Sequence, residues 1–590
     1  MSESRESLNN PLAIVSYMEK YTVPKPGHSS KLVADWVNEC LNDHPECRDT
    51  RQIKRLKPSR VLYVDPDQTD IIKLIPVTEK DDYQYVTLSH RWGSPEPPML
   101  TKFNNNPKRV FVGDLRKGLR ITELPQTFRD AVDVTRRCGI KYLWIDSLCI
   151  IQDIDPEKGN QDWAAEAGKM ADIYAGGVFN IAATIGRNSG AGLFPVQHDI
   201  LLPVVPGMTG QGQAQVIWEL PRDRFDNEIM SVELLSRGWV YQEVLLTPAN
   251  LFCTADEMWW SCTHATCSET FPGGAMMLNA FATGGDDRLS TVIDTLGDRK
   301  TAIMPHNASN PMRAWMDLIQ YYPETSITVS SDRLMAIAGI ANLFRAQFPD
   351  KLQTALYHSG VWFSSEYPNA LYQLLWHHSY LAPMRPHAVS YPVPSWSPMS
   401  CSGPIGFDFD TGDEAIPVEF VGVGSGDEGN PDKSEATGGR PRCILHLRGV
   451  LVSVDITCVM SEGKANKHGQ ASIHGLDDGK FRIHWDGVNT AARWDAARAL
   501  AMTFDDKEWK YPVVRGLLLK PAQGPPTDDG RMLWERCGYF VFSRITDEDA
   551  MRDVWEYFEL ARYGFSYDSN SKSVKKDVSA QLHLDDIYIV

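Results

Sequence analysis

The chain has 590 residues, of which 43% are hydrophobic and 10% aromatic, so it can bury more than one core and we expect two or three domains. Its formal net charge of −17 gives an acidic surface that repels phosphate backbones, which argues against nucleic acid as a partner. The sequence shows no apolar run of the roughly 18 residues that a membrane helix needs, no signal segment at its start and no disulfide-framework spacing among its 11 cysteines. We therefore expect a cytoplasmic protein without a membrane span.

Residues 1–80 have the composition of a helical and loop leader. Over residues 81–265, short apolar runs alternate with amphipathic stretches, which is typical of βαβ units. The apolar runs predict four strands, over residues 85–90, 141–146, 178–184 and 250–260.

Helical patterns separate the first three of these strands. Pro125 suits a first helical turn and Gly139 can adopt the left-handed conformation that ends a helix. Between them, apolar positions recur at helical spacing: Phe128, Ala131, Val132 and Thr135. A second stripe follows the second strand: Trp163, Ala167, Met170 and Tyr174. Two consecutive crossover helices make neighbouring strands parallel, so we predict an α/β fold with an open, mostly parallel, doubly wound sheet.

The sequence of the C-terminal half predicts a helical region followed by a strand-containing region. Residues 266–406 are expected to be mainly helical, with a proline- and tryptophan-rich end. Residues 407–590 are expected to contain strands, beginning near residues 444–454. The Gly/Asp/Ser-rich segment 422–441 cannot bury a core and predicts a flexible loop.

Three segments of the α/β region carry long motifs. Residues 85–93 read YVTLSHRWG, residues 124–153 read LPQTFRDAVDVTRRCGIKYLWIDSLCIIQD, and residues 236–243 read SRGWVYQE. In this order they resemble the diagnostic blocks of the fungal heterokaryon-incompatibility (HET) domain family. The one departure is His90, where the family usually has a tyrosine, which puts any role of the tyrosine hydroxyl in doubt here.

The resemblance implies an effector of non-self recognition, in which fusion of unlike fungal cells triggers programmed cell death. Its expected partners are proteins that control incompatibility, and it is a candidate homo-oligomer. HET domains also resemble TIR domains, some of which cleave NAD, and Ser236, Trp239 and Glu243 are similar to the TIR S-x-W-x-x-x-E pattern with spacing that differs by one residue. NAD is therefore a candidate substrate, and no cofactor is implied. The alternative is a non-enzymatic module that oligomerises and recruits other cell-death machinery.

The predicted topology indicates that the candidate site lies at the carboxyl ends of the parallel strands. Ligands of open parallel sheets bind beyond the carboxyl ends of the strands. Glu243 is the candidate catalytic residue, because a carboxylate beside an aromatic ring suits glycosidic chemistry. The candidate substrate-binding residues are Ser89, His90, Arg91, Trp92, Asp146, Arg237, Trp239 and Gln242. No G-x-G-x-x-G follows the first strand, which argues against dinucleotide redox chemistry.

The same residues also allow structural roles. Arg237 and Glu243 can form an ion pair while Trp239 fills the core, and Trp92 and Trp144 are more often packing residues than ligand platforms. Asp146 at the end of an apolar strand must find a partner if it is buried, and it can anchor the loop 89–93 through Arg91 or His90.

The cysteines raise two further hypotheses. Cys149 with His90 could form a thiol nucleophile and its base, but its apolar surroundings favour a packing role. Cys262, His264 and Cys267 are soft metal ligands close together, yet the sequence offers no evident second pair at zinc spacing. We therefore expect no metal and assign Cys262 to packing as a free thiol.

Overall fold

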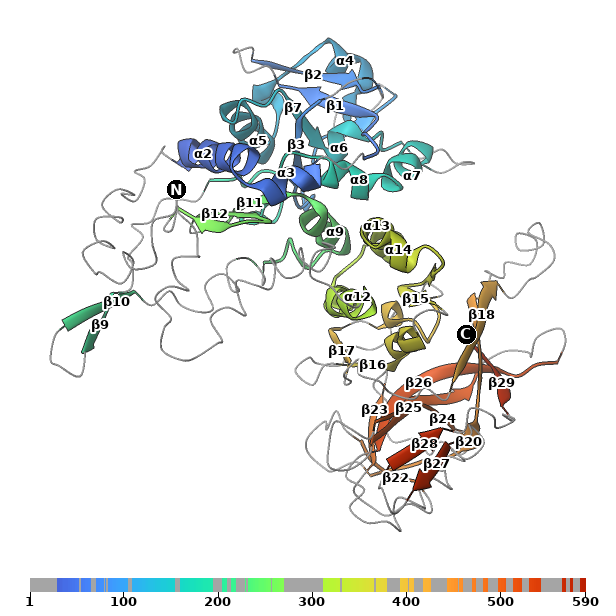
Figure 1. Ribbon diagram of the computed structural model, residues 1–590. Helices are drawn as coiled ribbons and strands as arrows, with labels where there is room; N and C mark the ends of the chain where they lie inside the picture. Colours follow the sequence, from blue (N-terminus) through green and yellow to red (C-terminus); the bar gives the residue numbers. More distant parts are fainter. Residues whose placement is uncertain are drawn as a thin grey trace. The chain divides into compact units, whose positions relative to one another are not determined.

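The structure is a computed structural model, and its chain divides into two compact units, residues 1–306 and 307–590 (Figure 1). The residues that it describes are 29–51, 55–64, 70–78, 80, 83–103, 109–153, 160–194, 204–208, 214–218, 229, 232–255, 257–269, 311–328, 332–364, 368–378, 393–401, 403–407, 418–425, 443–454, 456–459, 469–473, 481–485, 497–505, 513–522, 530–542, 565–568, 573–576 and 584–590. Among these residues, none of the helices has the length and apolar character that crossing a membrane requires.

A nine-stranded sheet forms the centre of the first unit. In spatial order its strands are β13 (Thr266–Ser268), β12 (Met258–Cys262), β11 (Ala249–Cys253), β8 (Asn180–Ala183), β3 (Tyr85–Ser89), β7 (Tyr142–Ile145), β1 (Arg60–Tyr63), β2 (Ile71–Pro76) and β6 (Leu119–Arg120). All five residues of β3 are buried, as expected for a strand covered on both faces.

The directions of the strands correct the prediction of a mostly parallel sheet. The four central strands β11, β8, β3 and β7 are parallel to one another. The outer strands pair antiparallel, so the sheet as a whole is mixed. A single strand was predicted over residues 250–260, but the structure has two, β11 and β12, which form a hairpin. Its turn is closed by Thr254, whose backbone N–H and side-chain hydroxyl both donate to the carbonyl of Glu257, at 3.2 and 2.7 Å.

The crossover helices connect the central strands. Helix α5 (Gln126–Arg137) links β3 to β7, and its predicted apolar stripe is buried. Gly139 has a φ of +71°, the left-handed conformation expected after this helix. The short helices α6 (Asp146–Cys149), α7 (Gln161–Ala167) and α8 (Met170–Ala175) link β7 to β8, and α9 (Gly238–Leu246) precedes β11.

The order of the central strands creates a topological switch point. The chain leaves β3 toward β7 on one side and then returns across it to β8 on the other side. Right-handed crossovers in opposite directions place their helices on opposite faces of the sheet, and Figure 1 shows α5 and α8 on either side of β3. The carboxyl end of β3, at Ser89, therefore lies where such sheets bind ligands.

The segment expected to be a leader packs against this sheet. Helices α2 (Ser29–Asn42) and α3 (Pro45–Arg51) precede β1 and β2. Val33, Trp36 and Val37 of α2 are buried in the same core as β3 and β7. The remaining elements of the unit are β4 (Met99–Thr101), β5 (Arg109–Phe111), α4 (Val112–Lys117), the 3-10 helix η2 (Ile121–Glu123), β9 (Val204–Met208) and β10 (Ala214–Trp218).

The second unit combines helices with a ten-stranded sheet. Its first part contains α12 (Pro311–Ile319), η4 (Tyr322–Glu324), α13 (Asp332–Gln347), α14 (Pro349–Leu352), β14 (Leu356–His358), β15 (Val361–Phe363), η5 (Pro368–Leu375), β16 (Trp376–His378), η6 (Pro398–Ser400) and β17 (Ile405–Phe407). The region predicted to be helical thus also contains strands.

The strands of the C-terminal region pair almost entirely antiparallel. They are β18 (Glu419–Ser425), β19 (Cys443–Gly449), β20 (Leu451–Ser453), β21 (Ile456–Val459), β22 (Gly469–Ile473), β23 (Phe481–Trp485), β24 (Arg498–Asp505), β25 (Val513–Pro521), β26 (Leu533–Phe542) and β29 (Asp585–Ile589), with β27 (Phe565–Asp568) and β28 (Ser573–Lys576) as a separate pair. The predicted strand near residues 444–454 is present as β19 and β20. Residues 422–425 of the predicted flexible loop belong to β18, and its remainder lies outside the described residues.

Candidate functional site

The three motif segments meet at the carboxyl end of β3. Ser89, the last residue of β3, donates a hydrogen bond from its Oγ to Oε2 of Glu243 in α9. The hydroxyl of Tyr174 in α8 hydrogen-bonds to the same carboxyl group. Ser89 and Glu243 are 154 residues apart in the sequence, so this buried carboxyl group joins the first and third motif segments to each other and to α8. The second segment meets the first through the hydrogen bond from Trp92 Nε1 to Asp146 Oδ2.

A ladder of hydrogen bonds through the buried side-chain amides of Asn180 and Asn250 links β3 to α9. Asn180 in β8 accepts a hydrogen bond from Thr87 Oγ1 at 3.0 Å, and its Oδ1 lies 3.1 Å from Ser89 Oγ. Its Nδ2 donates to Oδ1 of Asn250 in β11 at 3.3 Å, and Asn250 Nδ2 donates to the carbonyl of Val244 in α9 at 2.9 Å. The ladder therefore connects three parallel strands to the helix that carries Glu243.

Burial controls the ionisation of Glu243. Glu243 is only 6% exposed to solvent, and this burial raises the pKa of its carboxyl group from an ordinary value near 4.5 to about 7. The hydrogen bond from Ser89, the positive charge of Arg237 and the hydrogen bond from Tyr174 lower the pKa, whereas the charge of Asp146 raises it. Near neutral pH the protonated and ionised forms are both populated, which is the property expected of a group that does proton or charge chemistry.

Asp146 anchors the loop that follows β3. Its Oδ2 accepts a hydrogen bond from Trp92 Nε1 at 3.1 Å, and its Oδ1 lies 3.9 Å from His90 Nδ1. The same Oδ1 accepts from the backbone N–H of Ser147 at 2.6 Å. Asp146 thus holds the loop 89–93 through Trp92, whereas the sequence had suggested Arg91 or His90 as its partner.

His90 directly follows the last residue of β3. Its ring is buried edge-on against Phe128, with the ring centroids 5.0 Å apart. Burial lowers the pKa of His90, and the nearby Arg237 lowers it further, against the raising effect of Asp146. The ring is therefore held neutral at physiological pH.

The two arginines of the site bind protein groups. Arg237 donates from NH1 to the carbonyl of His90 at 2.9 Å, instead of forming the direct ion pair with Glu243 that the sequence allowed. Arg91 forms an ion pair with Glu233. Arg237 therefore holds the third motif segment against the first and acts on Glu243 through its charge.

A comparison with protein-family models identifies this region. Residues 85–243 match the family model described as heterokaryon incompatibility protein (HET). These residues are a HET domain. The match begins at the first residue of β3 and ends at Glu243, so it spans the three converging segments. No curated protein and no solved structure was found to match the chain.

The other two candidate residues of the HET domain lie on α9 with different surroundings. Trp239 is half-buried and stands edge-to-face against Trp163, with the centroids 6.2 Å apart and the ring planes at 85°. Gln242 is only 1% exposed, and its side-chain amide has no hydrogen-bond partner among the described residues. A buried amide without a partner is costly, so Gln242 is a group that a ligand or water could satisfy, as are the ring nitrogens of His90.

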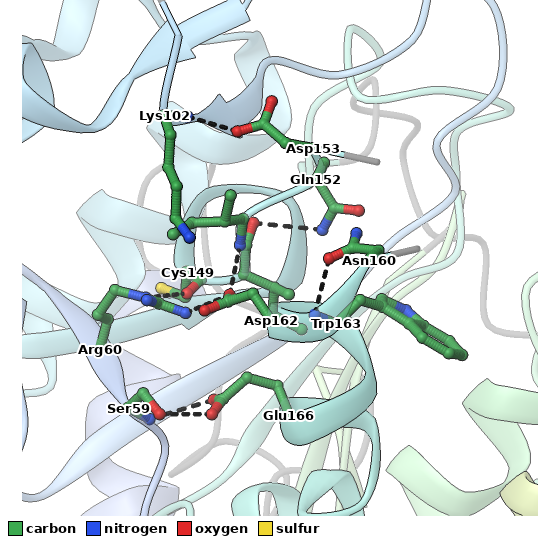
Figure 2. A network of polar contacts seen from close by, with 12 residues as sticks. Ser59, Arg60, Lys102, Cys149, Gln152, Asp153, Asn160, Asp162, Trp163 and Glu166 are labelled. Carbon is green, nitrogen blue, oxygen red and sulfur yellow. Dashed lines mark hydrogen bonds and ion pairs between the residues drawn. The ribbon is translucent and has the colours of Figure 1, made fainter. Parts of the chain in front are cut away.

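Other acids of the HET domain have structural roles, as Figure 2 shows. Arg60 in β1 forms an ion pair with Asp162 at 2.5 Å and donates from Nε to the carbonyl of Cys149 at 2.7 Å. Glu166 accepts hydrogen bonds from the backbone and hydroxyl of Ser59, at 3.1 and 2.5 Å. Asp153 accepts from the backbone N–H of Lys102 at 2.6 Å. These contacts bind the segment after β7 to β1 and to the loop after β4.

Cys149 lies within this network as a packing residue. It is completely buried, and burial raises the pKa of its thiol to about 12. A thiol with this pKa holds almost no thiolate at neutral pH. The structure therefore supports the packing role and gives no support to a nucleophilic Cys149.

The sequence did not single out Asn180 or Asn250, and it gave Tyr174 a place in a helical stripe but no role in the site. A signal for Asn180 was present, since a lone asparagine in the apolar run 178–184 needs hydrogen-bond partners once buried. The hydroxyl of Tyr174 had no such signal, because its partner is 69 positions further along the chain.

Proposed function

We propose that the HET domain is the effector of a heterokaryon-incompatibility response in a fungal cell and that it acts by hydrolysing NAD. The observation that carries this proposal is the position of Glu243. It is a buried carboxyl group with a pKa of about 7, at the carboxyl end of β3, where the sheet reverses its strand order. Strongly perturbed carboxyl groups at such points are characteristic of active sites.

The proposed reaction consumes one water, breaks the bond between nicotinamide and ribose C1′ and forms a bond from C1′ to the water oxygen, giving nicotinamide, ADP-ribose and one proton. Positive charge develops on the ribose as nicotinamide leaves. The ionised carboxylate of Glu243 stabilises this charge, and Ser89 and Tyr174, which hydrogen-bond to it, orient the carboxylate.

The neighbouring residues supply binding groups of the required kinds. Trp239 is a half-buried aromatic ring one helical turn before Glu243, suited to stacking against a base. Arg91 and Arg237 are half-buried cations suited to a pyrophosphate. The buried amide of Gln242 is a hydrogen-bonding group for the substrate.

The burial of Glu243 favours a second function class. A carboxyl group that is 6% exposed and hydrogen-bonded to two other segments also serves as a structural tie. In this second proposal the HET domain is a non-enzymatic module that oligomerises and recruits other cell-death proteins.

Purified full-length protein separates the two proposals. Incubated with NAD at high protein concentration, the wild type is expected to release nicotinamide, and Glu243→Gln to release at least about 100-fold less, since a positioned carboxylate contributes about that factor or more. The variant Glu233→Gln, which changes an exposed acid of the same region, is the matched control and should retain activity. Equal release by wild type and Glu243→Gln would remove Glu243 as the catalytic group, and no release by the wild type would leave only the interaction module.

A further inference from the structure

Four metal-ligating side chains come together in the first unit, away from the Glu243 site. Cys40 lies in the last turn of α2, His44 in the connection between helices, and Cys47 in the first turn of α3. The fourth, Cys262, is the last residue of β12. One ligand atom from each side chain lies within 4.8 Å of every other.

The distances between the ligand atoms agree with tetrahedral coordination. His44 Nδ1 is 3.6 Å from Cys262 Sγ and 3.9 Å from Cys47 Sγ. With zinc–sulfur bonds of about 2.3 Å and zinc–nitrogen bonds of about 2.0–2.1 Å, a tetrahedral site places sulfur about 3.6 Å from nitrogen. The side chains therefore need only small shifts to surround one ion.

The surroundings of the sulfurs suit thiolates. Arg51 NH2 donates to Cys40 Sγ at 3.3 Å, and the backbone N–H of Ala265 donates to Cys262 Sγ at 3.3 Å. Arg51 NH1 also donates to the carbonyl of Cys47 at 3.0 Å, which fixes the guanidinium beside the cluster. Hydrogen bonds to ligand atoms of this kind orient metal ligands and stabilise their charge. The His44 ring also packs on the ring of His264, with centroids 4.2 Å apart.

We propose that the chain binds one structural zinc ion through these ligands: Cys40, His44, Cys47 and Cys262. Three thiolates and one imidazole are a common zinc donor set, and because all four positions are filled by protein, the site is closed and structural rather than catalytic. Binding converts three thiols to thiolates and releases three protons, and the resulting negative site faces the positive charge of Arg51.

The zinc ion would fasten the N-terminal helices to the HET-domain sheet. Its ligands lie on either side of a long stretch of chain, since His44 and Cys262 are 218 positions apart. Cross-links that close such long loops restrict the unfolded chain strongly. This inference also replaces the expectation of no metal, because the ligands that accompany Cys262 come from α2, α3 and the connection between them rather than from His264 or Cys267.

Metal content of the full-length protein tests the proposal. Protein purified without chelators is expected to contain about one zinc per chain by elemental mass spectrometry. Cys262→Ser is expected to lower the content several-fold, whereas Cys267→Ala, a buried cysteine on the neighbouring strand β13, should keep one zinc. A folded wild type without stoichiometric zinc, an unchanged zinc content in Cys262→Ser, or a disulfide between Cys40 and Cys47 in the isolated protein would each overturn the proposal.

A second measurement does not depend on the variants folding. Wild type produced in cobalt-containing medium is expected to show the absorption bands of tetrahedral cobalt and of thiolate-to-cobalt charge transfer, because cobalt takes the same ligands. Removal of the ion with a strong chelator should lower the melting temperature of the wild type by about 5 °C or more. The absence of these bands from folded, cobalt-grown protein would contradict a thiolate site.

Discussion

Ser89 at the end of β3 donates a hydrogen bond to Glu243 in α9, although 154 residues separate them in the sequence. Both residues are buried, and Tyr174 from the intervening segment hydrogen-bonds to the same carboxyl group. The contact has two consequences. It joins the first and third HET-domain motifs, and it lowers the pKa of Glu243, which burial raises to about 7.

Replacing Ser89 with alanine removes a hydroxyl from this buried contact. We expect Ser89→Ala to destabilise the first unit by about 1–3 kcal/mol, because the buried Glu243 and Asn180 each lose a neighbouring polar group. Denaturant unfolding of the full-length protein measures the change. Ser236→Ala is the control, since this exposed hydroxyl bonds only locally to the carbonyl of Glu233, and it should stay within about 0.5 kcal/mol of the wild type.

The raised pKa of Glu243 predicts a specific pH dependence of stability. The folded protein binds the proton of Glu243 more tightly than the unfolded chain, so this contribution is fully present below pH 4.5 and is lost as the pH rises to about 7. Wild type should therefore lose on the order of 3 kcal/mol relative to Glu243→Gln between pH 4.5 and 7.5. Unfolding midpoints across this range measure it, with Glu233→Gln as a control that follows the wild type. Parallel curves for wild type and Glu243→Gln would mean that Glu243 titrates normally.

Substitutions at two glycines with positive φ, Gly93 and Gly139, distinguish the cost of backbone strain from the cost of a steric clash. Gly93 has a φ of +57°, and a Cβ there would lie 2.1 Å from the carbonyl oxygen of Arg187. Gly139 has a φ of +71°, but a Cβ there meets nothing within 4 Å. Gly139→Ala should cost about 1 kcal/mol, from the left-handed backbone alone. Gly93→Ala should cost at least twice as much, and thermal unfolding of the two variants provides the comparison. Equal losses would show that the loop 89–93 moves away without cost.

The hydrogen bond between Trp92 and Asp146 can be measured by a double-mutant cycle. We expect a coupling free energy of about 1 kcal/mol between Trp92→Phe and Asp146→Ala, since Asp146 is partly exposed and its bond to the indole N–H is 3.1 Å long. Unfolding free energies of the wild type, both single variants and the double variant give this value. Additive losses would show that Asp146 anchors the loop through other contacts.

Local patterns predicted the central elements of the fold well. The apolar stripe of α5, the buried run of β3 and the left-handed Gly139 each depend on residues close together in sequence. The hairpin of β11 and β12 was missed because its turn contains no glycine or proline and is closed by the Thr254 side chain. The outer strands β1 and β2 were missed because they are short. They pair antiparallel with each other, and β1 reaches the rest of the sheet only through β7, much later in the chain.

The sequence predicted several residues that the structure brings together at this site, but it did not predict which of them contact one another. The resemblance to known motifs brought Ser89, Arg237 and Glu243 into one site. However, the choice between Arg237 and Ser89 as the direct partner of Glu243 depends on how α9 packs against β3, which no local pattern encodes. The cysteine and histidine cluster was missed for the same reason, because Cys262 meets its neighbours only in the folded chain.

The level of NAD in living cells tests the central proposal most directly. Full-length wild type, Glu243→Gln and Glu233→Gln would be expressed at equal levels in yeast, and NAD and growth followed after induction. We expect wild type and Glu233→Gln to deplete NAD and arrest growth, and Glu243→Gln to do neither. Growth arrest with an unchanged NAD level, or equal NAD depletion by Glu243→Gln, would contradict the account.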